Sequence, residues 1–220
     1  MQRGPVGALF AVFTLGTAVA AVRHGADAVA DPTTHAWLVA GYWSLKTGVV
    51  AAFCWAVLRR SPSRRPAREL VAFVACTAAI LGGFALRGPE ATASTSMLIA
   101  GEVVTLLSCA FLLTSVLALG TCFGVLPEAR GLVTRGPYGL VRHPVYLGEL
   151  GVCAGLAIGA PTVWNLSAAA VVLAAQLVRM RLEERALARE FPEYAAYAAR
   201  TPRLLPLPFR LSPLEMSRCL

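Results

Sequence analysis

The residues best suited to chemistry in this sequence lie in one polar stretch between long apolar runs. The side chains concerned are Tyr138, Arg142, His143, Tyr146 and Glu149. Guanidinium, imidazole and carboxylate groups bind polar substrates and move protons, and tyrosine rings attract cations. The stretch is therefore a candidate site for binding and reaction. The alternative is a polar loop whose tyrosines and arginines sit at the level of the lipid headgroups.

The backbone of this stretch can be predicted from its prolines and glycines. Pro144 suits the first turn of a helix and keeps the preceding residue out of helical angles, so a helix is expected to begin there. His143 then stands at the N-cap, beside backbone N–H groups that have no partner within the helix and that bind anions well. Gly136, Pro137 and Gly139 make the preceding segment a turn.

Composition places the chain among polytopic membrane proteins rather than water-soluble domains. Of its 220 residues, 57% are hydrophobic, and the mean hydropathy is +0.64. The formal net charge of +8 is confined to loops, so it does not indicate nucleic acid as a partner. The six cysteines form no Cys-x-x-Cys pair, which favours packing roles over a disulfide framework or a metal site, and we expect no metal.

The apolar runs predict an all-α fold of about six hydrophobic helices. The first four are expected at residues 4–22, 36–58, 70–86 and 97 to about 123, with polar loops at 24–35 and 59–68. Residues 150–178 carry no charge. At 1.5 Å per residue, a single straight helix over this run would be about 43 Å long, which exceeds the thickness of the hydrocarbon core. Pro161 interrupts this run, and Thr162 can cap a second helix. The sequence therefore predicts a tight helical hairpin, 144–159 and about 162–190.

The distribution of basic residues predicts the orientation of these helices. Five arginines lie within residues 59–68 and eight basic residues lie from Arg179 onward, whereas the loops on the other side hold only Arg23 and Arg87. Basic residues favour the cytoplasmic side. Both termini, the polar stretch and a C-terminal helix and tail should therefore be cytoplasmic, in a multi-pass protein of the bacterial inner membrane.

The chain divides into three parts on this interpretation. Residues 1–125 form four transmembrane helices, residues 126–210 carry the polar connector, hairpin and charged helix exit, and residues 211–220 are a tail. Lys46 and Glu102 are charged residues within predicted spans, where such residues are functional candidates. We expect them to pair across the second and fourth helices, or to extend toward an interface.

A second polar cluster lies where the last hydrophobic helix leaves the membrane. Arg179 and Glu183 are four residues apart and share a helix face, with Glu184 beside them. The predicted hairpin returns this cluster to the membrane face that holds His143. Further on, Tyr194 and Tyr197 either cover the site or anchor the tail at the interface.

Three motifs occur in order over roughly residues 130–206. They are GPY-x-x-VRHP-x-Y-x-G, then R-x-x-x-EE, then F-x-x-Y-x-x-Y-x-x-R-x-x-R-x-x-P. In type and spacing they resemble the integral-membrane methyltransferases, which include isoprenylcysteine carboxyl methyltransferase and the phospholipid N-methyltransferases. The glycine-rich fingerprint of a dinucleotide-binding fold is missing from the sequence, as this resemblance leads one to expect.

The resemblance implies S-adenosylmethionine as methyl donor, bound at the cytoplasmic membrane face, and a lipophilic acceptor that enters from the bilayer. It implies that Arg179 orients the acceptor and that Glu183 contacts the cofactor, the two residues we expect to be catalytic. The residues implied to line the cofactor are Arg130, Gly131, Leu132, Val133, Tyr138, His143, Pro144, Val145, Tyr146, Glu183 and Glu184.

The positive charge of Arg179 bears on which chemical group of the acceptor is methylated. A carboxylate needs no base, and Arg179 could hold it by two hydrogen bonds, which favours carboxyl O-methylation of an isoprenylcysteine-like substrate. An amine would need a base, which His143 or Glu184 would supply. Phospholipid N-methylation and thiol S-methylation stay open as alternatives. We expect the lipid bilayer and the acceptor as partners, with no nucleic acid and no obligate protein partner.

Two further classes of protein are weighed against a methyltransferase. Membrane reductases of the steroid 5α-reductase-like type carry a similar RHP-x-Y-x-GE run, and Glu149 fits that pattern. Such a protein would bind NADPH. A non-enzymatic transporter or scaffold would use Lys46 and Glu102 as a pathway, although the internal repeats common in transporters are not evident.

Overall fold

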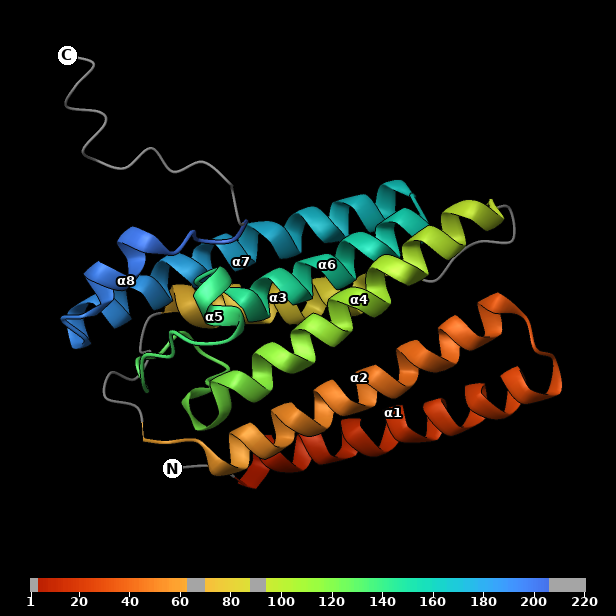
Figure 1. Cartoon of the computed structure of the whole chain (residues 1–220), viewed down its shortest axis with the longest axis horizontal. Coiled ribbons are helices and arrows are strands. Elements are labelled where there is room, and N and C mark those ends of the chain that lie inside the picture. The colour runs from red at the N-terminus through yellow and green to blue at the C-terminus, as the bar shows by residue number, and fades with distance from the viewer. Residues whose placement is uncertain (1–3, 63–69, 88–93, 206–220) are drawn as a thin grey trace, which may run out of the picture.

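The computed structural model describes residues 4–62, 70–87 and 94–205, and the regular structure in this part of the chain is helical (Figure 1). This confirms the all-α prediction. The helices are α1 (Gly4–Ala30), α2 (Thr34–Arg59), α3 (Leu70–Ala85), α4 (Thr95–Leu119), the short η1 (Gly120–Cys122), α5 (Pro137–Leu140), α6 (Pro144–Gly159), α7 (Val163–Glu190) and α8 (Tyr194–Arg200).

In the described part of the chain, six apolar helices overlap the six ranges predicted from the sequence, although α1 and α4 end at other residues than predicted. Four of them, α1, α2, α4 and α7, are long and apolar enough to cross a membrane. α3 and α6 are also apolar but have 16 residues each. At 1.5 Å per residue such a helix is about 24 Å long, somewhat less than a typical hydrocarbon core. Six complete spans, and the cytoplasmic placement of the tail, remain predictions.

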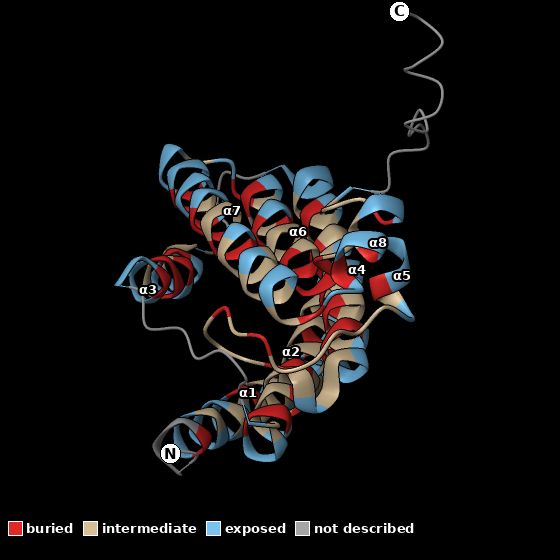
Figure 2. Ribbon diagram, turned by 90° about the vertical axis from the view of Figure 1, so that its left-hand side faces the viewer, coloured by how far each residue is buried: buried red, intermediate tan, exposed pale blue. Residues whose placement is uncertain are grey.

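The helices pack in a continuous sequence of neighbours, α1–α2–α4–α6–α7–α3. Viewed from one end, α1 lies beside α2 at one extreme of this arrangement and α3 lies beside α7 at the other (Figure 2). Between the two extremes, the rings of Phe13 and Phe84 stack with their centroids 5.6 Å apart. The helices therefore surround a space that α1 and α3 close with side chains.

Small residues bring α4 and α6 into close contact. A Cβ atom added to Gly148 would lie 2.8 Å from Cβ of Leu112, and one added to Gly101 would lie 2.6 Å from the carbonyl oxygen of Gly155 and 2.5 Å from the backbone nitrogen of Gly159. Glycines allow helix backbones to approach where lipid offers no hydrophobic driving force for association. This contact fixes the start of α6 against α4.

The predicted hairpin is confirmed within one residue at each end. α6 ends at Gly159, and the hydroxyl of Thr162 caps α7 by accepting a hydrogen bond of 3.1 Å from the backbone N–H of Asn165. The fully buried amide of Asn165 donates to the carbonyls of Ala160 and Arg87, at 2.9 and 3.1 Å. The turn is therefore tied both to itself and to the end of α3.

The predicted polar loop at 24–35 was wrong over most of its length. α1 continues to Ala30, and a short connection precedes α2. His24 and Asp27 sit one turn apart on this extension, 3.6 Å between Nδ1 and Oδ2. Loss of hydropathy marks the end of the lipid-facing segment but does not end a helix, because the alanines between Arg23 and Ala30 favour a helix and the next proline is Pro32.

The predicted pairing of Lys46 with Glu102 was also wrong. Glu102 forms an ion pair with His35 instead. The ammonium group of Lys46 lies 4.6 Å from the ring centroid of Trp43 and 5.2 Å from that of Tyr42. The reason is position along the helix: His35 at the start of α2 faces Glu102 near the start of α4, whereas Lys46 lies 11 positions further along α2, about 16 Å away at 1.5 Å per residue.

The end of α4 also differs from the prediction. The α-helix stops at Leu119 rather than near Phe123, and Gly120 then takes a φ of 55°, which favours glycine. Of the predicted loop at 59–68, residues 63–68 lie outside the described part, as does the tail at 211–220.

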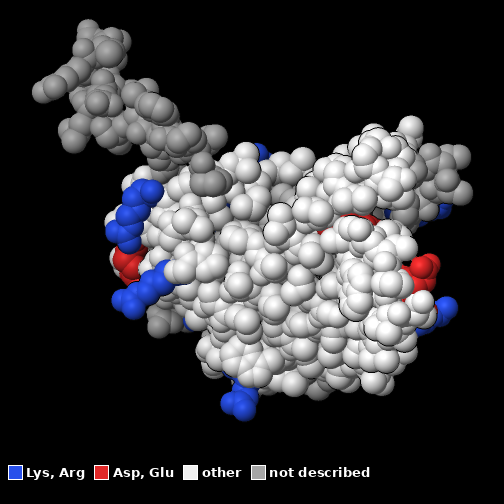
Figure 3. Space-filling view, turned by 45° about the vertical axis from the view of Figure 1, so that its right-hand side comes forward, with Lys and Arg blue, Asp and Glu red and all other residues white. Residues whose placement is uncertain are grey.

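Charge on the molecular surface is separated along the long axis. On the face shown in Figure 3, most Lys, Arg, Asp and Glu side chains lie toward the two ends, and a broad band of other residues covers the middle. Such a band is expected for helices packed in lipid.

Candidate active site

The start of α6 lies at the end of the bundle where α5, α8 and the end of α7 also meet (Figure 1). The helix begins at Pro144 with His143 at its N-cap, as predicted. The backbone N–H groups of Arg142 and His143 donate to the carbonyls of Pro202 and Arg203, at 2.8 and 3.2 Å. The chain after α8 therefore crosses the polar stretch and closes this end of the site.

Tyr146 joins α6 to the exit of α7. Its hydroxyl donates a hydrogen bond of 2.8 Å to Oε2 of Glu183. The guanidinium carbon of Arg179 lies 4.8 Å from the centroid of the same ring, a cation–π distance. Residues from two motifs that lie far apart in the sequence thus form one contact surface.

Glu184 gathers three basic side chains on the adjacent face of α7. Its Oε1 atom lies 3.0 Å from Nε2 of His143, 3.1 Å from an Nη atom of Arg142 and 3.2 Å from Nε of Arg203. The imidazole of His143 is 3% exposed, so the carboxylate fixes a buried ring. Glu184 therefore holds together the polar stretch, the helix exit and the segment after α8.

A further polar network lies deeper, between α6 and α7. One Nη of Arg179 donates to Oε1 of Gln176 at 2.8 Å and lies 3.8 Å from Oε2 of Glu149. Gln176 also donates from Nε2 to Glu149. The other Nη of Arg179 donates to the carbonyl of Val125 at 3.1 Å. Gln176 was not predicted to belong to the site, and Glu149 was predicted only as a member of the polar stretch, without a role in methyl transfer.

A signal for both residues is present in the sequence. Gln176 is an isolated polar residue in the uncharged run, three positions before Arg179 and on nearly the same helix face. Glu149 follows Tyr146 by three positions on α6, so the two share a face. Polar residues inside apolar helices are functional candidates, and this rule applies to both of them.

Aromatic residues close the side of the site next to α8. Tyr197 donates a buried hydrogen bond of 2.7 Å from its hydroxyl to the carbonyl of Tyr138. Burial, which disfavours the phenolate, raises the pKa of Tyr197 to about 12 and also raises the pKa of Tyr138. Both hydroxyls therefore stay protonated at physiological pH, and Tyr197 remains a donor.

Replacing Tyr197 by phenylalanine is expected to lower the free energy of unfolding by about 1 kcal/mol, because the carbonyl of Tyr138 loses its donor. Thermal unfolding of the purified protein measures this loss. The pKa of Tyr197 is higher in the folded state than in the unfolded state. The contribution of the Tyr197 hydroxyl to stability is therefore present below pH 10 and is lost as the pH rises to 12. The difference between wild type and variant should shrink over that range. An equal difference at pH 9 and pH 12 would contradict this account.

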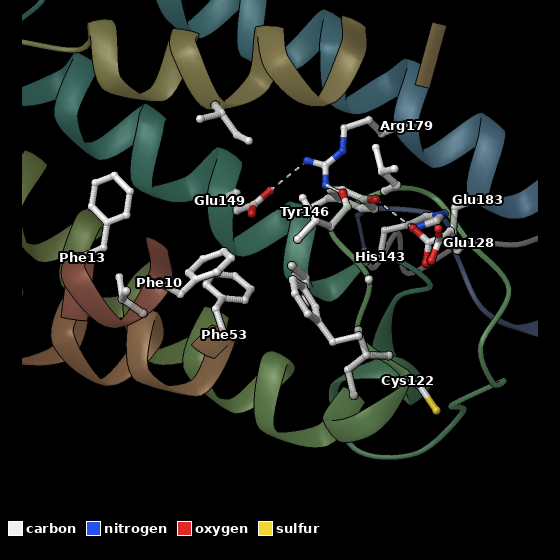
Figure 4. Close-up of a pocket in the computed structure, with 18 of the residues that line it drawn as sticks. Phe10, Phe13, Phe53, Cys122, Glu128, His143, Tyr146, Glu149, Arg179 and Glu183 are labelled. Carbon is white, nitrogen blue, oxygen red and sulfur yellow. Dashed lines mark hydrogen bonds and ion pairs between the residues drawn. The ribbon is translucent and has the colours of Figure 1, made fainter. Parts of the chain in front are cut away.

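A cavity of about 320 Å³ lies between these residues and the first three helices (Figure 4). Phe10, Phe13 and Phe53 line one side of it, and Glu149, Tyr146 and Arg179 line the other. This volume is at the lower end of the range for small-molecule sites, and an apolar lining with a few converging polar groups is typical of them.

A second, much smaller cavity of about 20 Å³ adjoins the first. Tyr194, Tyr197 and Leu187 line it from the side of α7 and α8. The residues that line both cavities, and so form a shared wall, are Leu119, Tyr138, Arg142, His143 and Glu183.

The predicted site residues are distributed over these two cavities. Gly131, Leu132 and Val133 line the small one, and Val145, Tyr146 and Arg179 line the large one. Tyr138, His143 and Glu183 line both. Pro144 is buried at the start of α6, and Glu184 serves the ion-pair cluster.

Arg130 stands apart from the other predicted residues. Its guanidinium donates to the carbonyl of Ser61 and pairs with Glu128, and it is not among the residues that line either cavity. This interaction joins the connector after α4 to the end of α2.

The fold and the site define a class of protein: a helical membrane protein with a cluster of polar residues beside a cavity at one end of its bundle. The family model of the phospholipid methyltransferases matches residues 86–194, and the chain belongs to this family of membrane methyltransferases. The matched region runs from the end of α3 to the start of α8, and so it includes most of the residues of the shared wall and of the Glu149 network.

Two curated relatives match a shorter part of the chain. The cobalt-zinc-cadmium resistance protein CzcN of Cupriavidus metallidurans is 46% identical over 79 residues, which are 34% of this chain and 35% of that protein. The nickel-cobalt-cadmium resistance protein NccN of Alcaligenes xylosoxydans xylosoxydans is 42% identical over 78 residues, 34% of this chain and 36% of that protein. The match thus spans about a third of the length of these relatives.

Proposed function

We propose that this protein transfers a methyl group from S-adenosylmethionine to a lipophilic acceptor within the membrane. The observation that carries the proposal is the shared wall between the two cavities, which Tyr138, His143 and Glu183 help to form. Methyl transfer requires donor and acceptor to approach in line, and holding both reactants contributes roughly 7–11 kcal/mol to lowering the barrier. Two adjoining cavities with a common polar wall suit this requirement.

The residues around the small cavity fit the chemistry of the donor, which supplies an electrophilic methyl group on a sulfonium. Tyr138, Tyr194 and Tyr197 offer aromatic faces to a cation. Glu183 offers a carboxylate, which can bind a cationic amine or ribose hydroxyls. Since this cavity is only about 20 Å³, a bound donor would also occupy the polar side of the large cavity.

The large cavity suits an acceptor that arrives from lipid. Leu9, Phe13, Ile80 and Phe84 line it from α1 and α3, and all four are also exposed on the outside of the bundle. α1 and α3 are the two extremes of the helix arrangement, joined there by the stack of Phe13 on Phe84. An apolar chain could therefore enter sideways between these helices, with its polar end directed toward Tyr146.

Two acceptor chemistries are compatible with this site. Arg179 supports carboxyl O-methylation of an isoprenylcysteine-like substrate, as the sequence suggested. Phospholipid N-methylation is favoured by a different observation: the guanidinium of Arg179 is already engaged by Gln176 and the carbonyl of Val125, with Glu149 close by. A carboxylate acceptor would have to compete with these groups for the same donors.

The experiment that tests the proposed function uses purified full-length protein. S-adenosylmethionine and NADPH binding are measured by calorimetry, and labelled methyl transfer is followed with prenylcysteine, phosphatidylethanolamine and long-chain thiol acceptors. Binding of NADPH without binding of S-adenosylmethionine would assign the protein to the reductase alternative.

Replacing Glu183 by alanine is expected to weaken S-adenosylmethionine binding by at least about tenfold, or 1.4 kcal/mol, because the shared wall loses its carboxylate and Tyr146 loses its acceptor. Calorimetry on the variant gives the affinity directly. Glu193→Ala, at an exposed position before α8, is the matched control and should bind normally. Unchanged cofactor affinity in Glu183→Ala would exclude this role for Glu183.

A further inference from the structure

Several charged groups near the large cavity have partners of their own. Glu184 pairs with Arg142, His143 and Arg203, and Arg130 pairs with Glu128. The ammonium of Lys46 lies against two aromatic rings of its own helix, which hold it in place without removing its charge. These interactions are separate from the pair formed by Glu149 and Arg179.

Three charged residues of the cavity lining lie around Tyr146, and they are not equivalent. Arg179 is the cation, and Glu149 and Glu183 are the carboxylates. Glu183 accepts the hydroxyl of Tyr146, which directs it toward the wall shared with the small cavity. Glu149 lines only the large cavity. It is the carboxylate nearest to Arg179, and it lies opposite the phenylalanines (Figure 4).

Glu149 is held in place but not enclosed. Gln176 donates to its Oε2 atom, and the Arg179 Nη atom lies 3.8 Å from the same oxygen. Its side chain is 28% exposed, whereas that of Arg179 is 11% exposed. The Nε atom of Arg179 is buried and has no hydrogen-bond partner within the described part of the chain. The network therefore presents a carboxylate to the cavity and keeps the guanidinium behind it.

We infer that Glu149 is a specificity-determining residue that sets the charge of the acceptor's polar end. This inference rests on the proposed function. With Glu149 ionised beside Arg179, the cavity accepts a neutral or cationic head group on an apolar chain and rejects an anionic one. Without that carboxylate, the charge of Arg179 is left uncompensated in an apolar surrounding, where a lipophilic carboxylate would neutralise it.

The test measures binding without the methyl donor, in full-length protein in phosphatidylcholine nanodiscs. Dodecylamine and dodecanoate are the charged probes, and dodecanol corrects for partition into the bilayer. Wild type is expected to bind the amine more tightly than the acid, on the order of tenfold, because like-charge contact with Glu149 disfavours the acid. Glu149→Gln is expected to reverse this preference. An unchanged preference in Glu149→Gln would overturn the inference.

Glu102→Gln is the matched control. It removes another carboxylate from an apolar helix, but Glu102 pairs with His35 and does not line the cavity, so the preference should match wild type. Loss of the preference in this variant as well would also count against the inference, because the effect would then not depend on the cavity.

A second variant covers the case in which Glu149→Gln does not fold, since an uncompensated buried charge is costly. The double variant Glu149→Gln with Arg179→Gln removes both charges and should fold more readily. It is expected to prefer neither probe. A retained preference for the amine would show that other groups select the head group.

Two more measurements separate this inference from the proposed function. S-adenosylmethionine binding to the same nanodiscs shows whether the protein is a methyltransferase, whatever the probe preference. Binding of dodecylamine is also measured with phosphatidylethanolamine in the nanodiscs. Displacement of dodecylamine by this lipid would show that the site also takes an amine carried on a lipid head group. Weaker cofactor binding in Glu149→Gln with an unchanged probe preference would place Glu149 in the donor site instead and overturn the inference.

Discussion

Replacing Glu184 by glutamine is expected to reduce methyl transfer by more than about 100-fold and to destabilise the protein by about 3 kcal/mol. One oxygen of Glu184 contacts three basic side chains, from the polar stretch and from the segment after α8. Removing one partner of a largely buried ion pair leaves the other charge without compensation, and such changes cost about 3–5 kcal/mol. The residual exposure of Glu184, 20%, favours the lower value.

The measurements for this variant are thermal unfolding, methyl transfer and limited proteolysis near Arg200. Proteolysis is informative because the segment after α8 should be released when Arg203 loses its partner. Glu184→Asp keeps the charge and should recover part of both losses, and the exposed Glu193→Gln should behave as wild type. A fully active and stable Glu184→Gln would show that the positions of the three basic side chains do not depend on this carboxylate.

Replacing Gly101 by valine is expected to prevent normal packing of α4 against α6. A Cβ atom at this position would lie 2.5 Å from a backbone nitrogen and 2.6 Å from a backbone oxygen of α6, and neither can rotate away. Overpacking of a well-packed interior costs roughly 1–3 kcal/mol, and more where the obstacle is backbone. We expect a loss of at least about 3 kcal/mol, seen as low yield of monodisperse protein and a lowered melting temperature.

Gly16→Val is the matched control for this prediction. Gly16 lies on the exposed side of α1, and a Cβ atom there would meet nothing within 4 Å. Its effect should be limited to the small difference in helix propensity between glycine and valine. Equal behaviour of the two variants would mean that the close approach of α4 and α6 is not needed for folding.

The hairpin and the start of α6 could be predicted because local backbone rules decide them. Pro144 permits only a few conformations, and Pro161 with Thr162 interrupts an otherwise uniform apolar run. The proximity of His143 to the end of α7 could be predicted from the hairpin. A tight turn makes the two helices antiparallel, so the end of the second helix lies beside the start of the first. The structure bears out this juxtaposition through the contact of His143 with Glu184.

Partners chosen by tertiary packing could not be predicted. Lys46 and Glu102 were paired because both are intramembrane charges, but His35 at the start of α2 reaches Glu102 first. Similarly, Arg179 was expected to present its guanidinium to an acceptor. Its hydrogen bond to Gln176 is local, between positions three apart on α7, but its hydrogen bond to the carbonyl of Val125 depends on how the connector after α4 folds back, which no local pattern specifies.

The segment after α8 gives the site an order of assembly. Pro202 and Arg203 accept the backbone hydrogen bonds of Arg142 and His143, although about sixty positions separate the two pairs along the chain. During translation, the loop around His143 therefore emerges well before the residues that cover it. A nascent chain that has emerged only to the end of α7 would have its apolar helices in place, but the polar cluster around His143 would still lack the cover of Pro202 and Arg203.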